Sequence, residues 1–350
     1  MRWLPTFPEL SQTVLTLGIG AAGAGLGALI HFPAPALTGP AVAVTLASLW
    51  GLRLDVIPLI RAAAFLVVGT GLGAIVTDET TEALTRWPLA IVVLAVGLVA
   101  TMAVSQWVLC RFFDFDRRGA VLAATPGHLS FVIGLGTSLN VDMARVTIVQ
   151  SLRLLTMSLA VPMFALVFGI QVTLGAVSSE APMAPLPFAA LILVAGAAGW
   201  GLARLHMPAA LIIGAMVVSA VAHGLGWIHG GLSPGVATVG FIVLGTLIGT
   251  RFTGVRPGAI VQAMGAGLAT TVIGSVFAAA AAFPVALWLD MPFMGTVAGF
   301  APGGFEMMIA LGAVLGANPG LVAACHLMRL LILTVLVPLF LARAGRRARA

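Results

Sequence analysis

The chain has 350 residues, of which 60% are hydrophobic and 8% are charged, and its mean hydropathy is +1.13. Soluble domains carry roughly 25% charged residues, so this composition excludes a water-soluble protein and indicates an all-α integral membrane protein. All 17 basic residues are arginine, against 11 acidic residues. With so little total charge, the excess suits short loops that set membrane orientation, and nucleic-acid partners are discounted.

Apolar stretches of about the length that a helix needs to cross a membrane follow one another along the chain. They cover residues 11–30, 34–50, 58–77, 87–110, 119–140 and 146–170, and then 186–204, 207–226, 235–250, 259–288, 291–317 and 320–342. The sequence therefore predicts two sets of six apolar segments.

The second set repeats the first. Gly69 and Gly73 recur 176 positions later as Gly245 and Gly249, and between residues 126 and 164 the same shift matches 13 of 39 positions. Chance would match roughly one in ten in so biased a composition. We therefore expect an internal duplication, with membrane repeats at 1–175 and 176–350.

The arginines predict that the repeats have inverted topology. Arginine follows the even-numbered segments in the first copy, as Arg117 and Arg118 do, but the odd-numbered ones in the second, as Arg204 does. We expect these residues and the Arg-rich tail on the cytoplasmic side, with residues 78–82 and Glu180 outside.

Inversion requires an odd number of crossings in each repeat, so one of the six segments must enter and leave on the same side. The fifth is the candidate, because Pro126–Gly127 and Pro302–Gly303 interrupt it. Each repeat is thus predicted to contain about five crossing helices and one broken, re-entrant segment. Whether that segment is a hairpin or an unwound crossing helix stays open.

The broken segments are where a transporter would place its site. Proline suits the first helical position, so we expect Thr125 and Ala301 to be cap residues and half-helices to begin at Pro126 and Pro302. Free N–H groups at such helix starts can bind an anion or a polar ligand. The alternative is a simple proline kink in a packing helix.

Arg153 and Arg329 lie near the midpoints of their segments, where a charge is costly. They either brace the broken backbone or contact substrate. Glu306 is the carboxylate placed well inside an apolar segment, and proton coupling through it stays open. The residues expected to bind substrate are Pro126, Gly127, His128, Ser130, Gln150, Arg153, Pro302, Gly303, Gly304, Glu306, His326 and Arg329.

Enzyme chemistry finds little support in the sequence. The six histidines are scattered, and Cys110 and Cys325 stand alone within apolar stretches. We therefore expect no catalytic residues, metal or other cofactor.

The duplicated pattern resembles the AbrB family of bacterial membrane proteins, which is distinct from the soluble DNA-binding regulator of the same name. The resemblance covers almost the whole chain. The elements that carry it are Pro126–Gly127 with Ser130, Gln150-x-x-Arg153, the run from Pro302 to Met307, and His326-x-x-Arg329. It implies an inverted-repeat transporter, although members have also been labelled regulators of gene expression.

The expected function is secondary transport of a small anionic or carboxylate-bearing solute by alternating access, with the site between the two broken segments. The alternatives are a membrane sensor or regulator without transport and, less favoured by the scattered histidines, a membrane-bound oxidase. We expect a multi-pass protein of the bacterial inner membrane, with the lipid bilayer and a small molecule or ion as partners. Association into a homodimer stays open.

Overall fold

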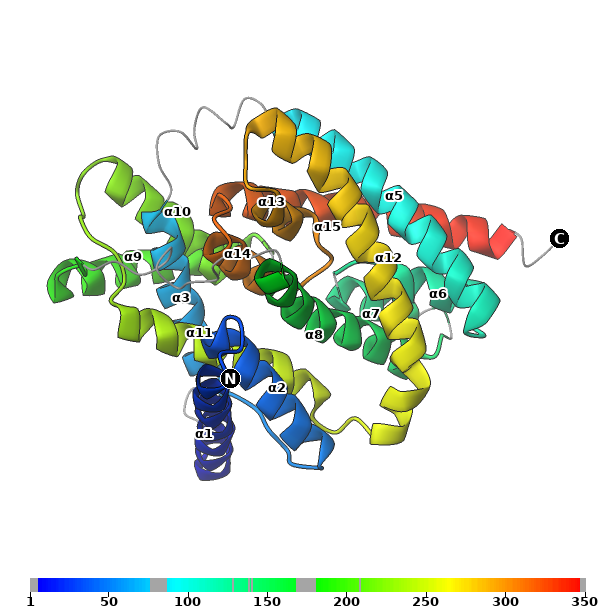
Figure 1. Ribbon diagram of the computed structural model, residues 1–350, viewed down its shortest axis with the longest axis horizontal. Coiled ribbons are helices and arrows are strands. Elements are labelled where there is room, and N and C mark those ends of the chain that lie inside the picture. The colour runs from blue at the N-terminus through cyan, green and yellow to red at the C-terminus, as the bar shows by residue number, and fades with distance from the viewer. Residues whose placement is uncertain are drawn as a thin grey trace. The chain divides into compact units, whose positions relative to one another are not determined.

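The computed structural model describes residues 6–75, 87–127, 129–137, 139, 141–167, 181–207 and 209–346 (Figure 1). In this part of the chain the regular structure is helical, and its β-type pairing is limited to an isolated bridge between Pro182 and Gly231. The predicted all-α class is confirmed there. The loop 78–82 and Glu180, which define the expected outer side, lie outside the described residues.

The helices follow the predicted apolar segments. Those of the first half are α1 (Phe7–Leu29), α2 (Pro35–Leu49), α3 (Pro58–Ala74), α5 (Trp87–Phe112), α6 (Arg117–Ala124), α7 (Leu129–Thr137) and α8 (Met143–Val167). Those of the second half are α9 (Pro185–Arg204), α10 (Ala210–Gly224), α11 (Pro234–Gly249), α12 (Pro257–Leu289), α13 (Phe293–Phe300), α14 (Phe305–Val314) and α15 (Pro319–Arg346), with the 3₁₀ turn η3 (Thr250–Phe252) after α11. Many begin with proline, whose missing N–H costs no hydrogen bond in a first turn.

The helices of the two halves correspond in order. α2 and α10 both contain 15 residues and begin 175 positions apart, whereas α6 and α13 both contain 8 residues and begin 176 positions apart. These are the offsets of the sequence match. The fifth apolar segment of each half is divided into two short helices, as the prolines predict.

Seven of the described helices are long and apolar enough to cross a membrane, and α2, α3 and α10 are shorter apolar helices. Much of their apolar surface is left uncovered by the protein: only 17% of the apolar window in α9 is buried. Val92 and Val96 on α5 are 59% and 66% exposed. Such surfaces need hydrocarbon as their solvent, so the chain is a multi-pass membrane protein.

Two compact units each draw helices from both halves. Unit 1 comprises the described residues of Met1–Glu82, Leu159–Gly254 and Ile309–Gly320, and unit 2 those of Ala83–Ser158, Val255–Met308 and Leu321–Ala350. Unit 1 thus holds α1 to α3 and α9 to α11, and unit 2 holds both breaks, at Pro126 and Pro302, together with α6, α7, α13 and the start of α14. The compact units cut across the expected division into repeats at 1–175 and 176–350, which stays a prediction about the duplication.

Glycines let the helices of unit 1 approach closely, and they do so in matched pairs. Gly23 of α1 lies against Gly39 of α2, and Gly199 of α9 lies against Gly214 of α10. A methyl group at Gly39 or Gly214 would collide with the backbone of the facing helix. The contact between α1 and α2 therefore recurs between α9 and α10.

The contacts between the two halves of unit 1 are matched in the same way. Gly69 of α3 lies against the carbonyl oxygen of Ile212 in α10, and Gly245 of α11 lies against that of Leu37 in α2. Exchanging the two halves at the sequence offsets turns one contact into the other. This exchange is the pattern that approximate two-fold symmetry produces.

Unit 2 is built around two long helices, α5 and α12, which run side by side in Figure 1. α6 packs against α5, and its counterpart α13 packs against α12. The side chains of Ala120 to Ala123 in α6 are completely buried in an apolar core with α5, α8, α12 and α15. Unit 2 thus holds the two first half-helices in equivalent places.

Candidate functional site

The two breaks differ from the prediction in where their half-helices begin and end. Thr125 and Ala301 are C-cap residues of α6 and α13, with ψ of 117° and 141°. They are extended because a residue before proline is pushed out of the helical region. The second half-helices begin at Leu129 and Phe305 rather than at the prolines. The expected N-caps are therefore wrong, and Pro126 and Pro302 lie in the connecting turns.

The broken segment of the first half folds back toward its starting end. Along α6 and α8, residues that face each other advance in the same direction: Leu122 contacts Gln150, and Thr125 contacts Arg153. Arg145, at the start of α8, donates to the carbonyl oxygen of Phe113, just before α6. Since α6 and α8 start at the same end and run in parallel, the chain between them must go in and return.

Gln150 compensates for a hydrogen bond that proline removes. The carbonyl oxygen of Leu122 would normally accept from the N–H four residues later, but that residue is Pro126, which has none. The side-chain amide of Gln150 donates to this oxygen through Nε2 at 2.8 Å. Because Gln150 is only 1% exposed, this bond satisfies a carbonyl that water cannot reach.

Arg153 and Arg329 occupy equivalent places, one at each break. Arg153 Nη2 donates to the Thr125 carbonyl oxygen at 3.0 Å, and Arg329 Nη1 donates to the Ala301 carbonyl oxygen at 2.6 Å. Each side chain is 2% exposed. These carbonyls end α6 and α13, where the helix dipole is negative, so each guanidinium group stabilises a helix end inside the protein. The expectation that both arginines brace the broken backbone is confirmed, and contact with substrate stays a prediction.

Arg329 reaches both breaks. Its Nη2 also donates to the Gly303 carbonyl oxygen at 3.2 Å. At the other break, a methyl group at Gly127, whose φ is +91°, would lie 3.6 Å from Arg329 Nη2. Nε of Arg329 and Nε of Arg153 are buried without a hydrogen-bond partner in the described structure. Each arginine therefore keeps an unused donor beside the broken backbone.

His326 takes the place of Gln150 in the second half but bonds differently. Its Nδ1 donates to the Val322 carbonyl oxygen in its own helix at 2.9 Å. The neutral ring then leaves Nε2 as an acceptor, and this atom is buried without a partner in the described structure. The ring is 0% exposed and packs edge to face against Phe305, at the start of α14, with 5.8 Å between the ring centroids.

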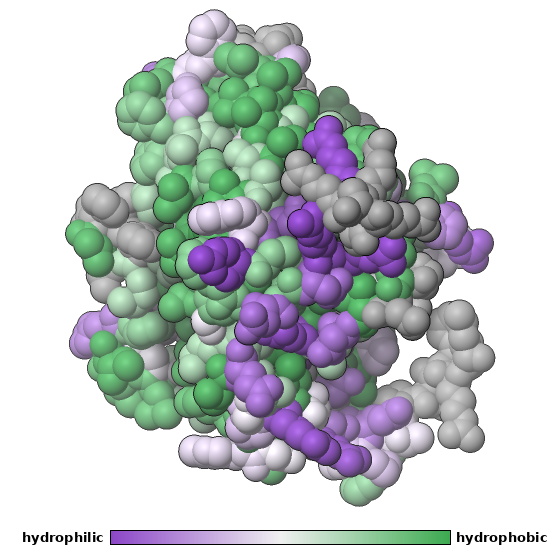
Figure 2. All heavy atoms as spheres, turned by 90° about the vertical axis from the view of Figure 1, so that its right-hand side faces the viewer, coloured by the Kyte–Doolittle hydropathy of each residue, from purple (hydrophilic) through white to green (hydrophobic). Residues whose placement is uncertain are grey.

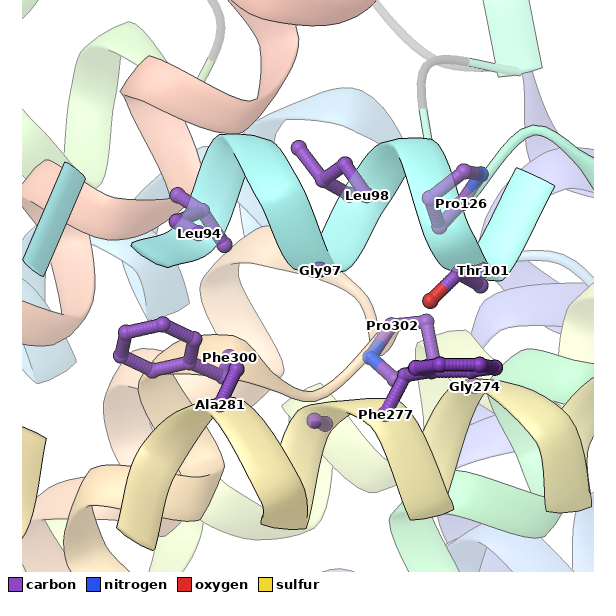
Figure 3. Close-up of a pocket in the computed structure, with 11 residues that line it drawn as sticks. Leu94, Gly97, Leu98, Thr101, Pro126, Gly274, Phe277, Ala281, Phe300 and Pro302 are labelled. Carbon is purple, nitrogen blue, oxygen red and sulfur yellow. The ribbon is translucent and has the colours of Figure 1, made fainter. Parts of the chain in front are cut away.

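A pocket of about 20 Å³ lies where the two breaks meet, which is room for roughly one water molecule. Figure 3 shows Pro126 and Pro302 lining it between α5 and α12, with Leu98 and Thr101 on α5 and Gly274 and Phe277 on α12. Gly274 and Phe277 lie 176 positions after Leu98 and Thr101. Gly274 is required here because a methyl group would lie 2.7 Å from Pro302 Cγ.

Most of the predicted residues thus gather in unit 2 around the two breaks. They are Pro126, Gly127, Gln150, Arg153, Pro302, Gly303, Gly304, His326 and Arg329. His128 lies outside the described residues, as do the side chains of Ser130 and Glu306, although the backbones of these two belong to α7 and α14. Their predicted role in binding substrate stays a prediction.

Sequence reasoning overlooked two features of this region. The carbonyl of Leu122 could have been found from the proline four residues after it. Thr101 was overlooked because a lone threonine within an apolar run has no distinctive signal, and its counterpart at the repeat offset is Phe277, which does not match it. Among the described residues, no three His, Cys, Asp or Glu side chains gather in a group that could hold a metal ion.

Comparison with known proteins identifies relatives along most of the chain. The family described as "Transition state regulatory protein AbrB" matches residues 37–344. The chain is 23% identical to "Putative regulator AbrB" of Escherichia coli (strain K12), over 86% of this chain and 87% of that protein. It is 24% identical to "Uncharacterized protein YhjN" of Bacillus subtilis (strain 168), over 71% and 69%. No solved structure matches. Because the family match covers most of its length, the chain belongs to the AbrB family.

Proposed function

We propose that this protein is a secondary transporter of a small carboxylate-bearing or other anionic solute in the bacterial inner membrane. The observation that carries the proposal is the meeting of the breaks at Pro126 and Pro302, each with a buried arginine, in one unit of a membrane protein. Irregular backbone at membrane depth is tolerated only where protein or a wet cavity surrounds it, and transporters use such breaks as binding sites.

An inverted arrangement of the two repeats agrees with the path of the chain. The segment between α6 and α8 returns to its starting end, so it adds no crossing. The second half has the same geometry where it can be compared, because Gly299 of α13 lies beside Cys325 of α15 and Ala301 beside Arg329. Five crossings remain in each repeat, and an odd number inverts the second relative to the first.

The division into units supports transport by alternating access. Both breaks belong to unit 2, and the matched glycine contacts hold unit 1 together separately. A transporter of this class moves one such body against the other around a fixed site. The pocket at the breaks holds only about one water, so a solute needs a rearrangement to enter.

The unused polar atoms at the breaks favour an anion with a hydrogen-bond donor. Nε of Arg153 and Nε of Arg329 are donors suited to a carboxylate, and Nε2 of His326 is an acceptor suited to a hydroxyl or a protonated acid group. Leaving the hydrogen bonds of such buried groups unmade costs free energy, which a bound solute would recover. The starts of α7 and α14 add N–H groups that attract negative charge.

The test is uptake of labelled small carboxylates, hydroxycarboxylates and inorganic anions into proteoliposomes containing the purified protein. We expect saturable uptake of at least one carboxylate, and its loss in His326→Gln with normal insertion. Arg256→Gln, which removes an exposed arginine at the start of α12, is the matched control and should transport normally.

Glu306→Gln tests the predicted role of a carboxylate known from sequence alone. We expect it to abolish uptake or to flatten the dependence of uptake on pH while the protein stays folded. Two results together would instead favour a regulator, as the name of the E. coli relative suggests. One is that no solute in a broad panel is taken up, and the other is that a ligand changes only the binding of this protein to another protein.

A further inference from the structure

A second cavity lies in unit 2, away from the pocket at the breaks. It has a volume of about 680 Å³ and lies between the ends of α5 and α15 and the start of α6. Its lining includes Gln106, Trp107 and Cys110 of α5, Arg117 of α6, and Phe340 and Arg343 of α15. We name it the α5–α15 groove. The proposed transport does not use it.

The groove lies at the depth of a membrane surface. Its α5 residues belong to the last turns of the span Pro88–Phe112, and its α15 residues to the last turns of the span Pro319–Ala344. Trp107 is 61% exposed, as expected for an indole ring at the boundary between hydrocarbon and water. Two membrane-spanning helices thus end together beside the groove.

The charges of the groove are positive and uncompensated. Arg117 and Arg343 are exposed, and neither forms an ion pair in the part of the chain that the structure describes. The neighbouring carboxylate of Asp116 accepts instead from the backbone N–H groups of Arg118 and Gly119. Figure 2 views the end of the molecule that carries the C-terminal end of α15 and shows hydrophilic residues gathered between hydrophobic areas.

We propose that the α5–α15 groove binds the phosphate headgroup of an anionic phospholipid. Arg117 and Arg343 would contact the phosphate, and the Gln106 amide would hydrogen-bond to the glycerol part. The apolar border of the groove is formed by Trp107, which is 61% exposed, and by the exposed Ala103, which offer surface to acyl chains. This apolar border is the reason to assign the site to a lipid rather than to a soluble phosphate.

Cys110 gives a natural readout of occupancy. The chain has two cysteines, and Cys110 is half-buried in the groove whereas Cys325 is 1% exposed. The experiment measures the rate at which N-ethylmaleimide modifies Cys110 in the full-length protein, in vesicles of phosphatidylcholine with or without phosphatidylglycerol. We expect phosphatidylglycerol to slow the modification severalfold.

The variant that tests the site is Arg117→Gln with Arg343→Gln, which should lose the slowing by phosphatidylglycerol. Neutralising an arginine near the surface should weaken the preference for anionic lipid about fivefold. Arg118→Gln with Arg256→Gln removes equal charge outside the groove and should keep the slowing. For each variant, the modification rate with phosphatidylglycerol is compared with its own rate without it, because Arg117 also influences the reactivity of the Cys110 thiol. Replacement of Arg117 and Arg343 by lysine should retain most of the effect.

Three results would overturn the proposal. Phosphatidylglycerol could leave the rate unchanged in the wild-type protein, or it could slow both double variants equally, which is a general surface effect. Glycerol 3-phosphate or inorganic phosphate could protect Cys110 in phosphatidylcholine vesicles as well as phosphatidylglycerol does, which would assign the groove to a soluble phosphate.

Discussion

The two broken segments have the same construction but differ in how their polar groups are used. At the first break, Gln150 and Arg153 each donate to a carbonyl oxygen of α6 or its C-cap, so α8 closes the end of α6 with two bonds. At the second, Arg329 alone makes both carbonyl bonds, and His326 turns to its own helix with Nε2 unused. The first break is therefore the more evenly braced, and the second keeps more unused polar capacity.

This difference indicates that the two breaks have different roles. A buried polar atom without a partner costs free energy, so it persists where a ligand uses it or where neighbouring contacts compensate. We expect the second break to bear more of the ligand binding and the first more of the structural support. Four measurements test this expectation.

The largest effect is expected from Arg329→Met. The substitution leaves the buried carbonyls of Ala301 and Gly303 without a donor, at about 1–3 kcal/mol each, so the free energy of unfolding should fall by about 2–6 kcal/mol. Arg153→Met removes one such donor and should cost about half as much. Thermal unfolding in detergent measures both, and equal losses would contradict the asymmetry between the breaks.

Gln150→Leu and His326→Leu form the second comparison. Gln150→Leu orphans the Leu122 carbonyl, which Pro126 cannot satisfy, so stability should fall by about 1–3 kcal/mol. His326→Leu removes a ring whose Nε2 has no partner, so stability should change by less than about 1 kcal/mol while uptake is lost. If His326→Leu unfolded the protein as readily as Gln150→Leu, the histidine would be structural.

Gly127→Ala should have a smaller effect. Gly127 has φ of +91°, which an alanine adopts only at a cost of about 1–2 kcal/mol. The closest atoms to the added methyl group, those of Arg329, stay at van der Waals distance, so the cost is one of backbone conformation. Gly304, at the second break, has no positive φ, and an added methyl group would lie at van der Waals distance, 3.8 Å, from Leu154 and Met307. The melting temperature of Gly304→Ala should therefore stay near that of the wild type.

The smallest effect is expected from the replacement of sodium. Transporters with broken helices often hold a sodium ion at the carbonyl end of a half-helix. Here Arg153 and Arg329 already place a positive charge at the ends of α6 and α13. We therefore expect uptake into proteoliposomes to be unchanged when choline replaces sodium. A requirement for sodium would show that the arginines alone do not stabilise the C-terminal ends of α6 and α13.

The sequence alone determined the helices and the positions of the breaks. Apolar runs of membrane length, and prolines that remove an N–H, act locally, so the interruptions at Pro126 and Pro302 could be predicted without knowledge of what packs around them. The duplication was equally visible, since Gly69 and Gly245 match at the repeat offset, and in the structure they serve equivalent helix contacts in the two halves. The arginines at the breaks could be singled out because a charge at that depth needs a partner.

Tertiary structure decided what those arginines bind and where the half-helices begin. Thr125 ends α6 because Pro126 forbids a helical residue before it, and the turn at Gly127 with its positive φ delays the next helix to Leu129. The partners of Arg153 and Arg329 are backbone carbonyls, which look alike at every position in a sequence. Only the parallel packing of α8 beside α6, and of α15 beside α13, selects the carbonyls 28 residues earlier, because burial leaves them no water to accept from.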